Sequence, residues 1–109
     1  MWYIILSRSL PDKEESKQLH TEEHRKWLEQ QHRTGLLLFS GPTSDRAYGI
    51  YIMLASSRSE AEQIAAQDPF HVYGVRTMEV LEWQPGRAFR MNGPTIADVE
   101  RMATVTDKR

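Results

Sequence analysis

Cysteine is absent from the 109 residues of the chain. The chain therefore has no disulfide framework, no thiolate nucleophile and no cysteine-ligated zinc or iron–sulfur site, as is usual in a reducing cytoplasm. An excess of positive charge is also lacking, because 14 lysine and arginine residues are balanced by 15 aspartate and glutamate residues. The net charge of −1 provides no strong field for a phosphate backbone, so we expect no nucleic-acid partner.

Long apolar runs are missing as well. The apolar stretch at the N-terminus, Trp2–Leu6, is far shorter than a bilayer span or the core of a signal peptide, and no basic segment precedes it. We therefore expect a cytoplasmic protein with no membrane partner. The length allows one small domain, and histidine, carboxylate and hydroxyl side chains are left to carry chemistry.

The residue pattern predicts six elements. Aromatic and β-branched residues predict four strands, at residues 2–6, 36–40, 47–55 and 75–83. A glycine- and proline-free segment, 12–33, predicts a long helix closed by Gly35, and two capping-box patterns near residue 57 begin a second helix that Pro69 ends. The order β-α-β-β-α-β predicts an α+β, ferredoxin-like fold, in which both helices cover one face of a four-stranded antiparallel sheet.

The first strand is apolar on both of its faces. Trp2, Ile4 and Leu6 fall on one parity, and Tyr3 and Ile5 fall on the other. A sheet with one solvated face would alternate apolar and polar residues, so the face without helices must also be covered. We expect two sheets to pack face to face in a homodimer, about 10 Å apart, the alternative being a ligand cleft closed by the tail.

The predicted domain covers residues 1–86, and residues 87–109 form a C-terminal extension. Within it, the spacing of Thr95, Asp98, Val99 and Met102 predicts a short amphipathic helix, with Thr95 as N-cap and Asp98 reaching back to it. Two roles stay open for this helix: docking on the partner subunit, or forming a mobile chain end.

His24 and Asp68 form the candidate catalytic pair. His24 shares a helical stripe with Trp27 and Leu28, and Asp68 continues the apolar stripe of the second helix. An inward carboxylate needs a partner, and a carboxylate that holds one imidazole nitrogen prepares the other for acid–base chemistry. The competing interpretation is structural: Asp68 caps the turn before Pro69 and His24 is an ordinary core histidine.

A short zinc-like pattern is also present. His20 to His24 match the H-x-x-E-H pattern of inverted zinc peptidases, but a glutamate-rich helix produces such a match by composition alone. We therefore predict no metal site and no cofactor, and interpret His20 and His32 as solvated helix surface.

Several segments together resemble the YCII-related (YciI-like) domain family over roughly residues 1–85. The most specific are Ser40-Gly41-Pro42 after the second strand, and Ala65-Ala66-Gln67-Asp68-Pro69-Phe70 followed by Gly74-Val75. The resemblance implies a ferredoxin-like subunit that dimerises into an α+β barrel, as in the superfamily of muconolactone isomerases and antibiotic-synthesis monooxygenases. It also implies that His24 and Asp68 form the active-site pair.

Two function classes follow. The first is a cofactor-free lyase, isomerase or dehalogenase that acts on a small polar, hydroxylated cyclic metabolite, since the family includes a dehydrochlorinase of chlorinated hydroxyquinols. The second is a non-catalytic dimeric module that binds a small molecule or a protein. A haem- or quinol-oxidising monooxygenase is less favoured, because no residue stands out as an axial ligand. The expected substrate-binding residues are Ser40 and Tyr73 for hydrogen bonds, Trp27 and Phe70 for apolar walls, and Arg8 for an anion.

The chain departs from the family pattern at two places. Many members carry an arginine three residues before the histidine and a leucine directly after it, where this chain has Thr21 and Arg25. If that arginine binds an anionic substrate, Arg8 or Arg25 is the expected substitute. The insertion between the second and third strands is shortened to residues 43–46, which predicts a more open pocket rim.

Overall fold

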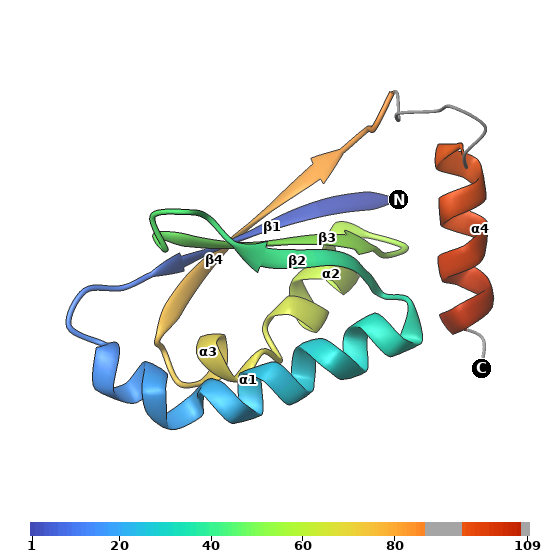
Figure 1. The fold of residues 1–109 in the computed structure, drawn as a ribbon. Helices are drawn as coiled ribbons and strands as arrows, with labels where there is room; N and C mark the ends of the chain where they lie inside the picture. Colours follow the sequence, from blue (N-terminus) through green and yellow to red (C-terminus); the bar gives the residue numbers. More distant parts are fainter. Residues whose placement is uncertain (87–94, 108–109) are drawn as a thin grey trace.

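The structure is a computed structural model that describes residues 1–86 and 95–107, with side chains described for 1–86 and 95–101. Figure 1 shows one layer of strands with helices below it and a further helix at one end. In chain order the elements are β1 (Trp2–Ser9), α1 (Glu14–Thr34), β2 (Leu37–Pro42), β3 (Tyr48–Leu54), α2 (Arg58–Ala65), α3 (Pro69–Val72), β4 (Arg76–Trp83) and α4 (Ile96–Asp107). No helix within these described ranges is both long and apolar enough to cross a membrane.

The four strands form one antiparallel sheet in the order β2-β3-β1-β4. The first strand is central, and its residue Ile5 lies opposite Tyr51 of β3 on one side and Val80 of β4 on the other. The predicted ferredoxin-like α+β fold is therefore confirmed. It places the start of β4 and the end of β1 beside each other, at the sheet end where α1 begins (Figure 1).

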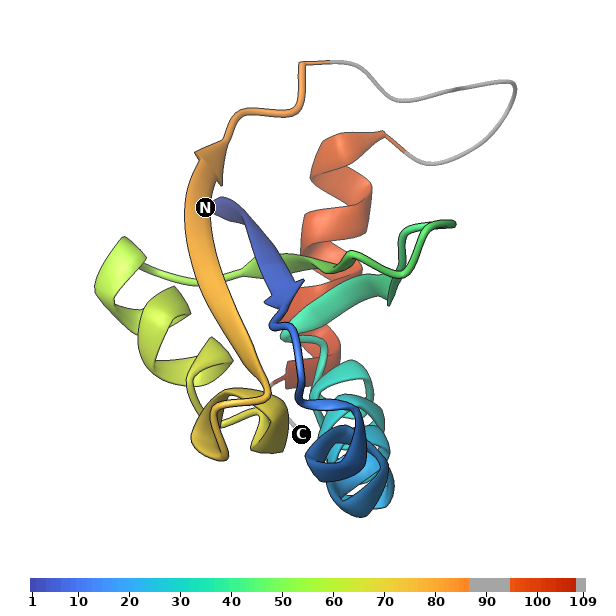
Figure 2. The same cartoon turned by 90° about the vertical axis from the view of Figure 1, so that its left-hand side faces the viewer.

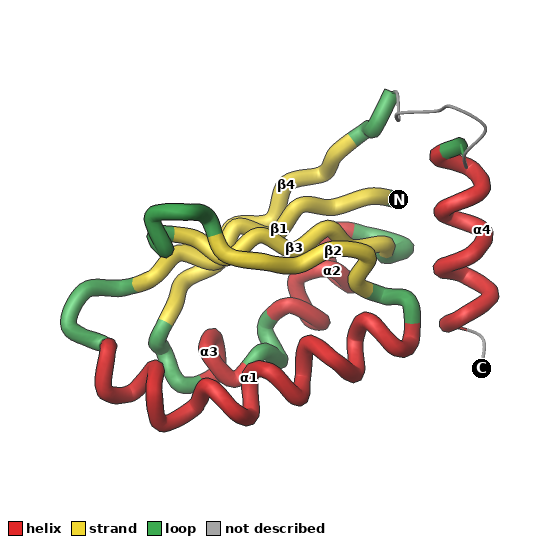
Figure 3. The backbone as a smooth tube through the Cα atoms, in the orientation of Figure 1, coloured by secondary structure: helices red, strands yellow, loops and turns green. Residues whose placement is uncertain are grey.

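The two faces of the sheet have different surroundings. One face packs on α1, α2 and α3, as Figures 2 and 3 show, and its side chains form the core: Tyr3, Ile5, Leu37, Tyr51, Met53 and Val80. The opposite face is also apolar. It carries Ile4 and Ile52, which are opposite each other, and three exposed side chains, Phe39, Leu81 and Trp83.

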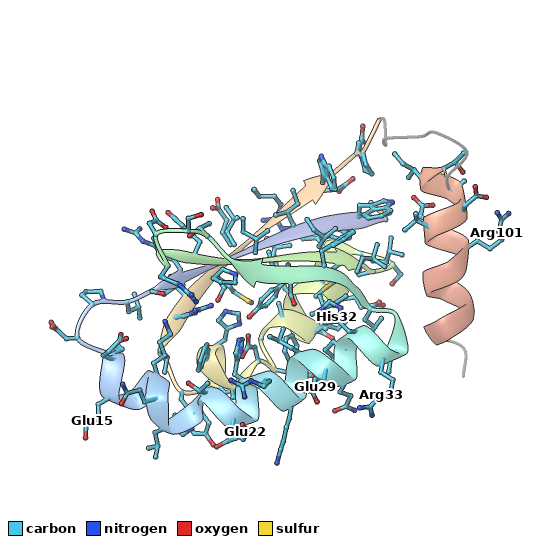
Figure 4. All side chains as sticks on the ribbon, viewed as in Figure 1. Glu15, Glu22, Glu29, His32, Arg33 and Arg101 are labelled. Carbon is cyan, nitrogen blue, oxygen red and sulfur yellow. The ribbon has the colours of Figure 1, made fainter. Side chains whose placement is uncertain are left out.

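The long helix α1 is amphipathic although its apolar stripe is narrow. Trp27 and Leu28 pack against the core, whereas Glu22 and Glu29 point away from the sheet (Figure 4). Gly35 ends the helix in the left-handed conformation, with φ of 83°, where a residue without a Cβ is favoured. The predicted helix and its glycine stop are confirmed.

The segment after α2 differs from the prediction. Ser57 caps α2 as expected, accepting a hydrogen bond from the amide of Glu60 at 3.1 Å. The helix ends at Ala65, however, and Pro69 begins a further short helix, α3, instead of only stopping the one before it. Proline suits the first position of a helix because that position needs no amide donor. Asp68 therefore lies in the turn between the two helices.

The connection between β2 and β3 is also corrected. The prediction ended the strand at residue 40, but Gly41 and Pro42 continue it, pairing with Ile50 and Gly49. Proline is tolerated here because β2 is an edge strand. The short turn that follows holds Arg46 at a positive φ of 64°.

The predicted C-terminal helix is present as α4. The Thr95 hydroxyl accepts a hydrogen bond from the Asp98 amide at 3.1 Å, and the Asp98 carboxylate accepts one from the Thr95 amide at 2.9 Å. The helix stands at one end of the sheet, where the indole of Trp2 donates to Glu100 (Figure 1). Met102, also assigned to this helix by the sequence pattern, has a side chain outside the described residues, as do residues 87–94 of the extension.

Candidate active site

The His24 and Asp68 side chains meet between α1 and the turn that precedes α3. The Nδ1 atom of His24 lies 2.7 Å from Oδ1 of Asp68, a normal hydrogen-bond distance. The Asp68 residue is completely buried, whereas 14% of the His24 side chain is exposed. The inward stripe of α1 thus brings an imidazole to a buried carboxylate and leaves part of its ring accessible.

Three donors satisfy the Asp68 carboxylate. Besides His24, the hydroxyl of Tyr51 donates to Oδ2, and the amide of Phe70 donates to Oδ1 at 2.9 Å. Burial raises the pKa of Asp68, but the hydrogen bonds from His24 and Tyr51 and the nearby imidazole outweigh it and hold this pKa below its usual value. Asp68 is therefore ionised at neutral pH. Asp68 thus caps the next helix, as the structural interpretation predicts, and also contacts His24.

This carboxylate defines which ring nitrogen of His24 carries the proton. An ionised carboxylate only accepts hydrogen bonds, so Nδ1 must be the protonated nitrogen and Nε2 the unprotonated one in the neutral ring. Phe70 stacks on the imidazole, with ring centroids 3.9 Å apart and planes 9° from parallel. The ring orientation is thus fixed by a hydrogen bond at one edge and a stacking contact on one face.

Tyr51 keeps its proton. Burial, followed by the negative charge of Asp68, raises the pKa of the Tyr51 phenol far above its ordinary value. The phenol therefore remains a hydrogen-bond donor to Asp68 at any physiological pH. This hydrogen bond links strand β3 to the His24–Asp68 pair.

A cavity of about 210 Å³ lies beside His24. It is bounded by α1, the end of β2, the turn before β3, β3 itself, α3 and the first residue of β4. The lining residues are Lys17, Thr21, His24, Leu28, Gly41, Pro42, Arg46, Gly49, Tyr51, Phe70 and Arg76. Three of these are cationic and none is acidic, so the cavity has a positive lining.

Only one of the five predicted substrate-binding residues lines this cavity, namely Phe70. Ser40 lies nearby on β2, but its hydroxyl contacts Nε2 of His32 at 2.7 Å. Tyr73 is half exposed and stacks on His20, with ring centroids 3.7 Å apart. These partners account for both side chains without a ligand.

Trp27 and Arg8 are the other two predicted contacts outside the lining. Trp27 packs against the core beside Tyr51, at a centroid distance of 6.0 Å. Arg8 does not line this cavity, because successive residues of a strand point to opposite faces. Its neighbour Ser7 is the buried residue that faces the helices, and Arg8 is exposed on the other face of the sheet.

Arg25, the other expected substitute for the family arginine, is also outside the cavity. It is exposed on α1 and approaches Glu22 at 3.6 Å. The cavity receives its positive charges from Lys17, Arg46 and Arg76, which the sequence pattern did not single out.

The zinc-like pattern does not gather a ligand set. His20 contacts Glu23 at 3.3 Å, and His24 is held by Asp68. In the part of the chain that the structure describes, no group of three histidine, aspartate or glutamate side chains could hold a metal ion. His20 and His32, both interpreted as solvated surface, are instead partly buried, with 15% of the His20 side chain exposed. Figure 4 shows His32 on the sheet side of α1.

A second histidine, His71, has a hydrogen-bond partner at each ring nitrogen. The Nδ1 atom of His71 donates to the carbonyl of Ala65 at 2.7 Å, and its Nε2 atom lies 2.6 Å from the hydroxyl of buried Ser7. Because the first contact requires a proton on Nδ1, Nε2 of the neutral ring accepts from Ser7. Burial lowers the pKa of His71. His71 therefore serves as a neutral structural link between β1 and α2.

This burial of His71 predicts a loss of stability in mild acid. The pKa of His71 is lower in the folded state than its ordinary value of about 6.5, so protonation favours unfolding. The contribution is complete above pH 6.5 and is lost as pH falls from there through the lower folded-state pKa. We expect urea unfolding between pH 7.5 and 5.5 to show a steeper decline for wild type than for His71→Gln, by at most about 1.4 kcal/mol per pH unit. Equal slopes would contradict this account of His71.

The comparisons with known proteins agree with the fold. The model of the YCII-related domain family matches residues 1–84. Among solved structures, 5-chloro-2-hydroxyhydroquinone dehydrochlorinase from Burkholderia phenoliruptrix, in complex with 2,5-dihydroxybenzoquinone, is similar with a TM-score of 0.68 and 23% sequence identity. The similarity covers 79% of this chain and 96% of that chain, and at this identity it establishes a shared fold. No curated protein matches the chain.

Proposed function

The chain belongs to the YCII-related domain family, and from this premise we propose that it is a cofactor-free lyase, isomerase or dehalogenase. Its substrate is a small, polar, hydroxylated cyclic metabolite, and His24 is the general acid and base. The observation that carries this proposal is the 2.7 Å contact between His24 and buried Asp68 beside a positively lined cavity.

The chemistry follows from the proton on Nδ1. With that proton donated to Asp68, the Nε2 atom of His24 is free to take a proton from a substrate in the cavity. The resulting imidazolium is stabilised by the adjacent carboxylate, as in other histidine–carboxylate pairs. In an isomerisation the same proton returns to another substrate atom. In an elimination of HCl, Nε2 of His24 removes a substrate proton and passes it to water, while chloride leaves with the electron pair of the carbon–chlorine bond. The substrate thus loses one H⁺ and one Cl⁻.

The size of the cavity and the similar dehydrochlorinase support a ring substrate. A volume of about 210 Å³ is below the roughly 300–1,000 Å³ of pockets for drug-sized ligands, and it suits one substituted ring. The similar enzyme binds 2,5-dihydroxybenzoquinone and is named for a chlorinated hydroxyhydroquinone. The Phe70 ring, in the wall of the cavity, offers an apolar surface to such a ring.

Turnover of a halogenated ring tests the proposal. Under anaerobic conditions the purified protein is incubated with 5-chloro-2-hydroxyhydroquinone, and chloride release is followed by ion chromatography. Unhalogenated hydroxyhydroquinone is incubated in D₂O, and hydrogen–deuterium exchange at its ring carbons is followed by NMR. We expect either reaction to exceed the rate without protein at least 100-fold. Saturable ligand binding with neither reaction would instead indicate the non-catalytic binding module.

We also propose that the apolar sheet face forms a homodimer. Ile4 and Ile52 are flanked on this face by exposed Phe39, Leu81 and Trp83, and contiguous apolar patches of this kind mark interfaces. At one end of this face, Ile96 and Val99 of α4 line an apolar cavity of about 250 Å³ with Phe39, Ile52 and Trp83. Such a dimer matches the barrel that the family resemblance implies.

Substitution on this face should produce a monomer. Wild type is expected to have twice the 12.7 kDa mass of the chain in light scattering, whereas Ile52→Asp is expected to have the single mass, because an unpaired carboxylate would be buried between the sheets. Val72→Asp is the matched control, since Val72 is exposed on α3 in the helical layer. A dimeric Ile52→Asp variant would exclude this face as the interface.

A further inference from the structure

Arg76 is a buried cation without an anionic partner among the described residues. Only 8% of this residue is exposed, and its Nε atom has no hydrogen-bond partner. None of the ion pairs in the described part of the chain includes it. Burial of an unpaired charge lowers the stability of the folded state, so buried charges are normally paired with a group of opposite charge.

The backbone around Arg76 makes room for its guanidinium. Arg76 is the first residue of β4, and its side chain reaches across the inward face of the sheet to Gly49 of β3. A Cβ atom at residue 49 would lie 2.5 Å from Nη1 of Arg76, closer than side-chain atoms approach. Glycine at this inward strand position therefore leaves the space that the guanidinium occupies.

The Arg76 guanidinium and the His24 imidazole both contact the ring of Phe70. The central carbon of the Arg76 guanidinium lies 4.9 Å from the centroid of Phe70, on which His24 also stacks. Both groups line the same cavity, and neither Asp nor Glu is among its lining residues. Asp68 does not line this cavity, and its carboxylate accepts hydrogen bonds from His24, Tyr51 and the Phe70 amide.

We propose that Arg76 binds the oxyanion of the substrate, and that the substrate class is a small ring bearing a carboxylate or an ionised enol. This inference rests on the proposed function and specifies its substrate. The planar guanidinium pairs with such a delocalised oxyanion through two parallel hydrogen bonds. Lys17 and Arg46, at the same cavity, attract the anion from solution. The bound anion supplies the negative charge that Arg76 lacks.

Comparing the affinities of benzoate and its neutral isostere benzamide distinguishes recognition of charge from recognition of shape. Each is titrated into ¹⁵N-labelled protein, and the amide of Gly49 and the Nε–H of Arg76 are followed by NMR. We expect benzoate to shift both signals and to bind at least tenfold more tightly than benzamide. Equal affinities, or no benzoate binding, would overturn the inference.

Variants distinguish a ligand-binding arginine from a structural one. Arg76→Met is expected to weaken benzoate binding at least tenfold and to raise the thermal midpoint by about 4 °C or more, since it removes an unpaired buried charge. Arg8→Met, on the other face of the sheet, should change neither quantity. Gly49→Ala, which displaces the guanidinium and keeps its charge, should also weaken benzoate binding. A lower midpoint for Arg76→Met with unchanged benzoate preference would identify Arg76 as structural and overturn the inference.

The binding experiment requires no turnover. Failure of the acid–base proposal with a retained preference for benzoate would leave the role of Arg76 standing. Turnover that depends on His24 without any preference for the anion would overturn this inference alone.

Discussion

His24→Gln is expected to reduce turnover of the ring substrate by 10²- to 10⁴-fold, the usual contribution of a positioned general acid or base. Glutamine retains a polar side chain of similar reach, but it neither accepts nor releases a proton at neutral pH. The Asp68 carboxylate keeps its donors from Tyr51 and Phe70, so the fold should persist. Measurement of kcat by chloride release, together with an unchanged circular dichroism spectrum, checks the effect.

The matched control is His20→Gln. His20 lies one turn earlier on α1, stacks on Tyr73 and does not line the cavity. We expect its kcat to stay within about twofold of wild type. Equal losses in the two variants, or a fully active His24→Gln protein, would remove the mechanism proposed for this site.

Asp68→Ala is expected to destabilise the protein by about 3–5 kcal/mol, as when one partner of a buried charged pair is removed. Without the carboxylate, the Tyr51 hydroxyl and the Phe70 amide lose their acceptor, and the His24 ring loses its restraint. Urea unfolding at pH 7 measures the loss. Asp45→Ala is the control, because Asp45 is exposed in a turn and its loss should cost far less. A similar cost at both positions would contradict the burial-based account.

The acid dependence of Asp68 has a defined sign. Its folded-state pKa is below the ordinary value of about 3.9, so its contribution to stability is complete above that value and is lost as pH falls through the lower pKa. Asp68→Asn has no such titration. The stability difference between wild type and Asp68→Asn should therefore narrow below pH 4, and a difference that widens there would contradict the assignment.

The fold could be predicted from the sequence because its main elements follow local sequence patterns. The dense apolar strands and the helix closed by Gly35 needed only periodicity and capping to be placed. The turn at Asp68 was harder, because a proline both ends one helix and begins another, and sequence alone did not indicate which would occur. Its position depends on tertiary contacts with His24 and Tyr51.

The site could be predicted only in part, because it too depends on tertiary contacts. The pairing of His24 with Asp68 followed from two inward stripes, but Tyr51 looked like an ordinary strand aromatic. Arg76 and Gly49 come from different strands, and their relation depends on the register of the sheet, which the sequence did not give. The sequence does contain the pattern that indicates this contact, namely a cation at an inward strand position, Arg76, and a glycine, Gly49, two strands away in the sheet. The sequence prediction ended the first strand at residue 6, so it did not place Arg8 on the sheet face opposite the helices.

The protonation of the His24 ring tests the central claim most directly. Two-bond ¹⁵N–¹H correlation spectra of the neutral imidazoles distinguish a proton on Nδ1 from one on Nε2. Donation of Nδ1–H to Asp68 predicts that neutral His24, which lines the cavity, is in the Nδ1–H form with Nε2 unprotonated. A proton on Nε2 of His24, or the averaged signals of a free histidine, would contradict the proposed acid–base pair.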